Sequence, residues 1–361
     1  LGRLEMRLKW ILVLLVAGGA ALLVTFRAEV AMWVMGRTLE QNLARDAVAE
    51  LPDGLHLAVC GAGAPLPDAD RSGPCLAVIA GRRLFVVDAG SGGARNLQRM
   101  GFNSGSVEAV FLTHFHSDHI DGLGELAMLR WTGAAHTAPL PVHGPTGVER
   151  VVAGFNQAYA LDAGYRTAHH GAGVAPPSGA GAAPVTFEVP EDDSRVTVWE
   201  GGGITVSAFP VPDDPVVPAV GYRFDYAGRS VVISGDTRYH PPLAEHAAGV
   251  DLLAHEALAP QLVGLINRAA TATGRTGVAK ITADILDYHT TPEEAARLAA
   301  AADAGHLLLY HVVPPLPLPG LDTAFLEGVA EVYAGGVTLS RDGTFVSLPA
   351  GGSAIELGNR L

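Results

Sequence analysis

The sequence predicts a mixed α/β domain that follows an N-terminal transmembrane helix. Two observations indicate the α/β domain. Short β-type runs broken by Gly and Pro alternate with helical segments from residue 55 onward, and 48% of the 361 residues are hydrophobic while only 17% are charged. This composition is ample for a large core and excludes a disordered or collagen-like chain. The third observation is an uncharged apolar stretch at residues 10–26 that follows Arg3, Arg7 and Lys9.

The apolar stretch is just long enough to cross the hydrocarbon core of a bilayer if it is helical. Because cations flank its N-terminal side, the positive-inside rule places the rest of the chain outside the cytoplasm, in the periplasm or at the cell surface. We therefore expect a signal anchor at residues 1–30 and a membrane-anchored domain behind it. A cleaved signal peptide is the alternative that stays open.

The remaining boundaries follow from changes in the pattern of apolar residues. Apolar side chains repeat every four positions after the anchor, which predicts a helical stalk or linker at residues 31–54. The main domain is expected at residues 55–350, and residues 351–361 are expected to form a C-terminal tail.

The charge balance argues against an unassisted nucleic-acid-binding protein. Lys plus Arg total 24 against 37 Asp plus Glu, so the formal net charge is −13 at pH 7. Lysine occurs only at Lys9 and Lys280, which leaves no polybasic patch outside the first residues. A negatively charged polymer is therefore repelled at long range.

Cysteine is scarce, and this limits the kinds of metal site. The only two cysteines are Cys60 and Cys75, so histidine and carboxylate side chains must hold any metal. Cys60 closes one β-type run and Cys75 opens the next. The sequence leaves open whether they form a disulfide or remain buried thiols.

A cluster of metal-ligand types follows the β-type run at residues 107–113. The segment T-H-F-H-S-D-H contains His114, His116, Asp118 and His119. With the two-residue period of a strand, the first two histidines point the same way, while the other two side chains reach a second position. Imidazole and carboxylate are the ligands of hydrolytic zinc, or of manganese or iron where carboxylates predominate. The spacing therefore suits two metal ions.

This segment resembles the H-x-H-x-D-H motif of the metallo-β-lactamase superfamily, and the resemblance extends over residues 55–348. It implies a four-layer αββα sandwich. In F-V-V-D-A-G, Asp88 matches an acidic residue that supports the metal loop without binding metal. The resemblance also implies that Asp236 in S-G-D-T bridges both metals and that His311 in L-Y-H supplies the last histidine ligand.

Further segments resemble the branch that contains ribonuclease Z and arylsulfatase-like enzymes. Residues 60–67 match its opening strand and loop, H-E-A-L contains Glu256, and H-T-T begins at His289. By this resemblance Glu256 orients His289, which acts as an electrophile or proton donor near the leaving oxygen. Independently, T-P-E-E from Thr291 has the pattern of a helix start, which places His289 on the loop just before a helix.

The sequence differs from the pattern of the superfamily at the position of one histidine ligand. Where relatives carry a third histidine for the first metal, this chain reads F-P-V-P-D-D-P-V, which puts Asp213 at that position with no histidine nearby. Either Asp213 or Asp214 is a ligand in a carboxylate-rich first site, or that site is impaired and one metal remains. We expect Asp213 to be the ligand.

The resemblance implies a hydrolase that cleaves a phosphodiester or a sulfate ester with a metal-activated hydroxide. Asp118, Glu256 and His289 are the expected catalytic residues. The expected cofactors are two divalent metal ions, zinc in the first place and manganese or iron as alternatives. Two other functions stay open: a catalytically impaired extracytoplasmic binding protein, and a lactonase or other carboxyl-ester hydrolase.

The expected partners are a small-molecule ester and, through the N-terminal helix, the membrane. Ribonuclease Z carries a basic tRNA-binding arm where this chain has residues 151–203, whose only Lys or Arg residues are Arg166 and Arg195. Since affinity for polyanions comes largely from cationic contacts, this argues against tRNA. The oligomeric state stays open, a homo-oligomer included.

Overall fold

The computed structural model describes the backbone of residues 2–361 and divides the chain after Asp46 into two units. The first unit contains α1 (Gly2–Thr25) and α2 (Arg27–Ala44). In the part of the chain that the structure describes, no helix is both long enough and apolar enough to cross a membrane.

The prediction of an N-terminal transmembrane helix is therefore wrong, and so is the membrane-anchored location outside the cytoplasm that depended on it. The physical reason is the length of the apolar segment. Helix α1 ends at Thr25, so its uncharged part from residue 10 rises only about 24 Å, against about 30 Å for a hydrocarbon core. The preceding turns carry Arg3, Glu5, Arg7 and Lys9.

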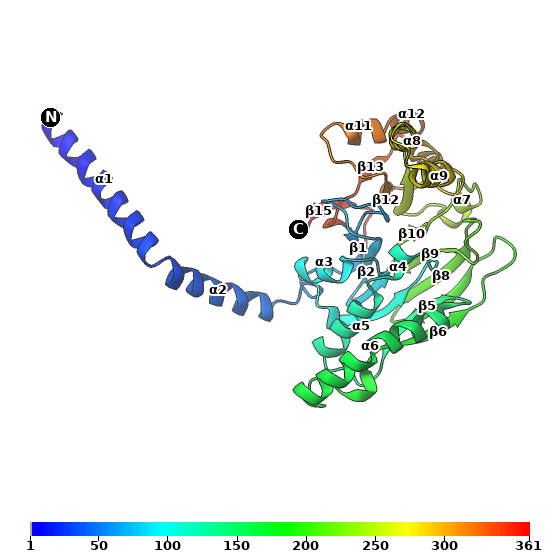
Figure 1. Ribbon diagram of the computed structural model, residues 1–361, viewed down its shortest axis with the longest axis horizontal. Helices are drawn as coiled ribbons and strands as arrows, with labels where there is room; N and C mark the ends of the chain where they lie inside the picture. The colour runs from blue at the N-terminus through cyan, green and yellow to red at the C-terminus, as the bar shows by residue number, and fades with distance from the viewer. Residues whose placement is uncertain (1) are drawn as a thin grey trace. The chain divides into compact units, whose positions relative to one another are not determined.

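The second unit, Ala47–Leu361, is built on two mixed β-sheets (Figure 1). The first sheet has the order β15-β14-β1-β2-β3-β4-β5-β6. Its strands are β1 (Gly54–Gly61), β2 (Cys75–Ala80), β3 (Arg83–Val87), β4 (Val107–Phe111), β5 (Leu140–Pro145), β6 (Ala182–Phe187), β14 (Thr344–Pro349) and β15 (Glu356–Asn359). Strands β3 to β6 run parallel to one another.

The second sheet has the order β13-β12-β11-β10-β9-β8-β7. Its strands are β7 (Val196–Gly201), β8 (Ile204–Pro210), β9 (Val220–Tyr226), β10 (Arg229–Ile233), β11 (Leu252–Leu258), β12 (His306–Val313) and β13 (Gly336–Leu339). Strands β10 to β13 run parallel to one another. A parallel sheet needs crossover connections, which the intervening helices supply.

The second unit also contains α-helices between these strands. They are α3 (Gly93–Arg99), α4 (Ser117–Ile120), α5 (Leu123–Gly133), α6 (Val148–His170), α7 (Leu243–His246), α8 (Pro260–Ala272), α9 (Thr276–Asp284), α10 (Pro292–Ala301), α11 (Leu321–Phe325) and α12 (Val329–Val332). Short 3-10 turns occur at Ser104–Ser106 and Pro177–Gly179.

Three clusters of buried side chains define the layers. One packs the two sheets together, with Phe85 and Phe111 of the first sheet against Phe224 of the second. A second lies between the first sheet and helices α3, α5 and α6, and a third lies between the second sheet and helices α7, α10, α11 and α12. The order of layers is the αββα arrangement that the resemblance implied. Parallel strands of both sheets end near one edge, where a ligand site is expected.

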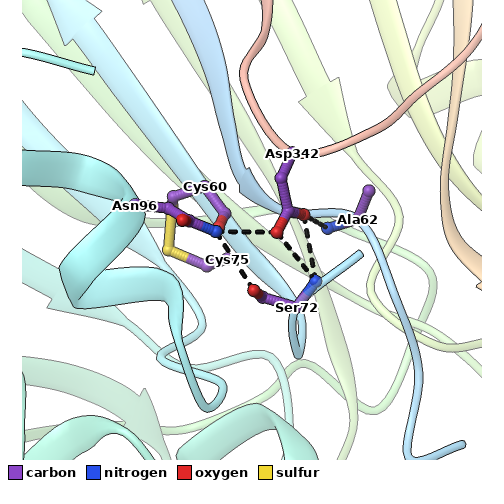
Figure 2. Close-up of a disulfide and its surroundings, with 6 residues drawn as sticks. All are labelled: Cys60, Ala62, Ser72, Cys75, Asn96 and Asp342. Atoms are coloured by element: carbon purple, nitrogen blue, oxygen red, sulfur yellow. Dashed lines mark hydrogen bonds between the residues drawn. A yellow bond between two sulfur atoms is a disulfide. The ribbon is translucent and has the colours of Figure 1, made fainter. Parts of the chain in front are cut away.

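A disulfide joins β1 to β2, which decides the alternative left open by the sequence (Figure 2). Cys60 and Cys75 are bonded with their Cα atoms 5.0 Å apart. The carboxylate of Asp342, just before β14, accepts hydrogen bonds from the backbone nitrogens of Ala62 and Ser72. It therefore connects both arms of the loop between the cysteines to the segment that leads into β14. The disulfide and this carboxylate therefore fix the same loop.

Replacing both cysteines by serine is expected to lower the free energy of unfolding by about 3 kcal/mol, the value for a closed loop of roughly 15 residues. The cause is the larger conformational entropy of the unfolded chain without the cross-link. Equilibrium denaturation of the full chain, with and without reductant, measures this difference. A variant as stable as the oxidised parent would contradict it.

Candidate metal centre

The loop that carries the metal-binding motif is fixed by a buried carboxylate behind it. Asp88, directly after β3, accepts hydrogen bonds from the backbone nitrogen and the hydroxyl of Thr113, both at 2.8 Å. Asp88 Oδ2 also lies 2.8 Å from His119 Nδ1, which leaves Nε2 of that ring to face the centre. A carboxylate on the far nitrogen of a ligand histidine sets the ring orientation and raises its basicity. This contact agrees with the supporting role that the resemblance gave Asp88.

The structure brings all seven predicted metal ligands together. They are His114, His116, Asp118, His119, Asp213, Asp236 and His311. Their ligand atoms form overlapping groups of three, each within 4.8 Å; one contains His114, His116 and Asp213, and another contains Asp118, His119 and His311. Within the first group, His114 Nε2 lies 3.1 Å from His116 Nδ1.

Asp236 lies between the two groups. Its Oδ2 is 3.3 Å from Nε2 of both His119 and His311, and 3.9 Å from His114 Nε2. The residue follows β10, and the preceding Gly235 has φ +65°, which turns the chain after the strand. An added Cβ at Gly235 would come 2.6 Å from the carbonyl oxygen of Val220, so only glycine fits this close approach.

His311 reaches the centre through an irregularity in β12. Glu256 pairs with Tyr310 and Ala257 with Val312, so His311 is the extra residue of a bulge. Its φ of +46° is left-handed, a rare conformation for a residue other than glycine. The bulge directs His311 Nε2 to 3.4 Å from Asp118 Oδ2. Strained backbone of this kind persists where surrounding structure holds it, often at functional sites.

Of the two adjacent aspartates, Asp213 faces the centre. It is only 1% exposed, and its Oδ2 lies 4.0 Å from His114 Nε2. Asp214 instead has a 61% exposed side chain and pairs with Arg238 Nη2 at 3.4 Å. The position where the resemblance implied a histidine therefore presents a carboxylate to the same group of ligands.

Buried polar atoms of the centre fit bound cations. Among the residues described by the structure, both carboxylate oxygens of Asp213, Oδ1 of Asp236 and Nε2 of His119 are buried without a hydrogen-bond partner. Gathering ionised carboxylates away from water is costly unless a positive charge compensates them. Burial and the neighbouring charge of Asp236 raise the pKa of Asp213 to about 8. A metal ion would reverse that shift, since ligands bind in their deprotonated form.

Glu256 and His289, two of the predicted catalytic residues, lie beside this cluster of ligands. Glu256 on β11 is fully buried, and its Oε1 accepts a hydrogen bond of 2.7 Å from the backbone nitrogen of Thr290. Its Oε2 lies 3.3 Å from His289 Nδ1. The predicted helix start is confirmed, because Thr291 and Glu294 form a capping box at the beginning of α10. The cap fixes the loop that carries His289.

The environment of His289 favours its charged form. Burial lowers its pKa, but the Glu256 carboxylate and then Asp236 and Asp213 outweigh burial and raise it to about 9. One of its ring nitrogens lies within 4.8 Å of ligand atoms of Asp236 and His311. A cationic side chain therefore stands at the border of an acidic cluster.

Three positioning residues were not assigned by the sequence reasoning. Thr113 holds Asp88, and Thr290 holds both Glu256 and, through its hydroxyl, the carbonyl oxygen of Thr237 at 2.6 Å. The hydroxyl of Ser234 accepts a hydrogen bond of 3.0 Å from the backbone nitrogen of Glu256. All three flank predicted site residues in the sequence, and that proximity was the only available signal.

A family model described as "Beta-lactamase superfamily domain" matches residues 83–312. The chain belongs to the metallo-β-lactamase superfamily. Within this superfamily it is similar to Ribonuclease Z of Mycobacterium avium (strain 104), with 35% identity over 290 residues, 80% of this chain and 96% of the relative. Ribonuclease Z of Mycobacterium marinum (strain ATCC BAA-535 / M) is 34% identical with the same coverage. The chain is thus a ribonuclease Z-like metallo-β-lactamase hydrolase, and its family implies divalent metal ions.

Solved structures of the superfamily share the fold. The metallo-β-lactamase fold protein YhfI from Bacillus subtilis superposes with a TM-score of 0.56 at 20% identity, over 81% of this chain and 99% of that one. The short form of human tRNase Z gives a TM-score of 0.56 at 19% identity, over 81% and 99% of the respective chains. At these identities the superpositions support the fold alone.

Proposed function

We propose that this metallo-β-lactamase hydrolase cleaves phosphodiester bonds at a centre of two divalent metal ions. The observation that carries the proposal is the Glu256–His289 pair beside the ligand cluster. A phosphodiester is an anion and gains negative charge on its leaving oxygen, so a held cation there stabilises the reaction. A carboxyl ester is uncharged and gains less from this residue, which argues against the lactonase alternative.

The grouping of the ligand atoms supports an assignment of the two ions. His114, His116 and Asp213 would hold the first, Asp118, His119 and His311 would hold the second, and Asp236, which faces both groups, would contribute to both. When bound, such ions act as Lewis acids and lower the pKa of a coordinated water. The chain itself orients the groups: Asp88 holds the His119 ring, and Glu256 holds His289.

His289 supplies the proton in this proposal. With its pKa raised to about 9, the ring carries a proton at neutral pH and can give it to the departing alkoxide or phenoxide. The Glu256 carboxylate beside Nδ1 orients the ring in this role. Asp118, whose pKa is lowered to about 2 by His311 and His119 against the effect of burial, remains a carboxylate and directs the attacking water.

Small phosphodiesters are the proposed substrates. The segment where ribonuclease Z carries its basic arm forms α6, β6 and β7 here, and its only Lys or Arg residues are Arg166 and Arg195. Arg166 is paired with Asp162 at 2.6 Å, which leaves little positive charge for a polyanion. A second candidate is processing of RNA, which the 35% identity to Ribonuclease Z favours.

Parallel assays of the metal-loaded full chain test this proposal. The substrates are bis-p-nitrophenyl phosphate, p-nitrophenyl sulfate and a tRNA precursor with a 3′ extension, and a chelator-treated sample is the control. We expect metal-dependent turnover of the small phosphodiester, with slower turnover of the sulfate ester and of the RNA. Efficient cleavage of the RNA would favour the second candidate, and turnover of the sulfate alone would overturn the proposal.

A further inference from the structure

We propose that Asp213 makes the first metal site selective for manganese or ferrous iron, compared with the same site carrying histidine. This inference rests on the two-metal centre of the proposed function. It concerns Asp213, whose buried carboxylate lies with His114 and His116 where the resemblance implied a third histidine. Its consequence is a first position with two imidazoles and one carboxylate besides Asp236, where histidine at residue 213 would give three imidazoles.

The available oxygens of Asp213 are the first argument. In the described part of the chain, neither Oδ1 nor Oδ2 has a hydrogen-bond partner, although the side chain is buried. Both oxygens are therefore free to bind one ion. A carboxylate that binds through both oxygens raises the coordination number above the four that zinc prefers, whereas manganese and ferrous iron accept larger, oxygen-rich shells.

The charge of the centre is the second argument. Asp118, Asp213 and Asp236 supply three carboxylates, one more than a centre with histidine at this position. Carboxylate oxygens are hard ligands that suit manganese, while imidazole suits zinc, copper and nickel. Exchanging one imidazole for a carboxylate therefore moves the preference of the first site away from zinc.

Hydrogen bonds hold the backbone of the loop that carries Asp213. A side chain at this position is therefore held next to the other ligands. The backbone nitrogen of Val216 donates to the carbonyl oxygen of Asp213 at 2.8 Å. The backbone nitrogen of Arg238 donates to the carbonyl oxygen of Pro212 at 3.0 Å, and the hydroxyl of Thr237 donates to that oxygen at 3.3 Å. These contacts tie the loop to the segment that carries Asp236, so both carboxylates are held by one framework.

Binding of each metal alone to the metal-free full chain tests the inference. Calorimetric titrations give the affinities for Mn²⁺ and Zn²⁺, elemental analysis gives the number of ions per chain, and electron paramagnetic resonance reports Mn²⁺ directly. Because zinc binds more tightly than manganese at most sites, the readout is the ratio of the two affinities. We expect Asp213→His to shift this ratio toward zinc at one site by at least about tenfold, the scale on which changes around a metal alter affinity.

The controls separate the outcomes. Asp214→His places a histidine at the exposed position next to Asp213 and should leave the ratio of the Mn²⁺ and Zn²⁺ affinities unchanged. Asp213→Asn should weaken Mn²⁺ binding at one site while thermal unfolding shows an intact fold. An unchanged ratio in Asp213→His with both sites filled would overturn the inference, as would a parent chain that leaves the first site empty with either metal. A chain that binds both ions as expected but cleaves no phosphodiester would overturn only the proposed function.

Discussion

Replacing Asp236 by alanine is expected to abolish metal-dependent hydrolysis and to reduce the bound metal to one ion or fewer per chain. Its carboxylate is the one group that faces both sets of ligands, at 3.3 Å from His119 and His311 and at 3.9 Å from His114. Without it, neither ion keeps its full set of ligands, and the metals no longer share an anion that holds them close together.

Turnover of bis-p-nitrophenyl phosphate and elemental analysis of the same samples measure this effect. Asp214→Ala is the matched control, because Asp214 directly follows Asp213 in the same loop but has an exposed side chain. That variant should retain metal and activity. Full turnover with both ions still bound in Asp236→Ala would contradict the bridging role.

Replacing His289 by alanine is expected to lower kcat by about 10²- to 10⁴-fold, the usual contribution of a general acid. The bound metal should remain near the parent value, because His289 is a proton donor in this account and all seven proposed ligands stay in place. Glu256→Gln should give a smaller loss, since the ring stays present but loses the carboxylate that holds its charge. A loss of metal equal to that of Asp236→Ala would instead show that His289 is a ligand.

The pH dependence separates a proton donor from a residue that only fills space. The pKa of His289 is raised to about 9, chiefly by Glu256 against the effect of burial, so the ring is charged at neutral pH. Activity that needs this proton should fall as the pH rises through about 9. In Glu256→Gln the pKa of His289 should drop, and the alkaline fall in activity should move to lower pH. An alkaline limb that does not move would contradict the role of Glu256.

Most of the metal centre could be predicted from the sequence because its ligands are local or occur in distinctive short motifs. The spacing of T-H-F-H-S-D-H follows from the geometry of a strand that ends in a turn. Asp236 and His311 were identified by resemblance alone, since neither a turn aspartate nor a strand histidine has a pattern of its own. The bulge that aims His311 depends on pairing between β11 and β12, which no local pattern reveals.

The preference for Asp213 over Asp214 rested on the resemblance, because no local pattern separates the two residues. Both precede Pro215 in the same short segment, and only the tertiary fold turns one inward and leaves the other exposed. At the N-terminus, the uncharged stretch was read as a membrane span, although its 17 residues rise only about 26 Å as a helix, less than the thickness of about 30 Å of a hydrocarbon core. Helix α1 ends one residue earlier still, at Thr25, and the charged Arg27 begins α2, so the error lay in accepting too short a stretch.

The most direct test of the metal centre is anomalous X-ray diffraction from crystals of the metal-loaded full chain, recorded at the absorption edges of the bound metals. The account predicts two ions. One lies among His114, His116 and Asp213, the other lies among Asp118, His119 and His311, and the Asp236 carboxylate stands between them. A single ion in the second position, with Asp213 binding nothing, would contradict it.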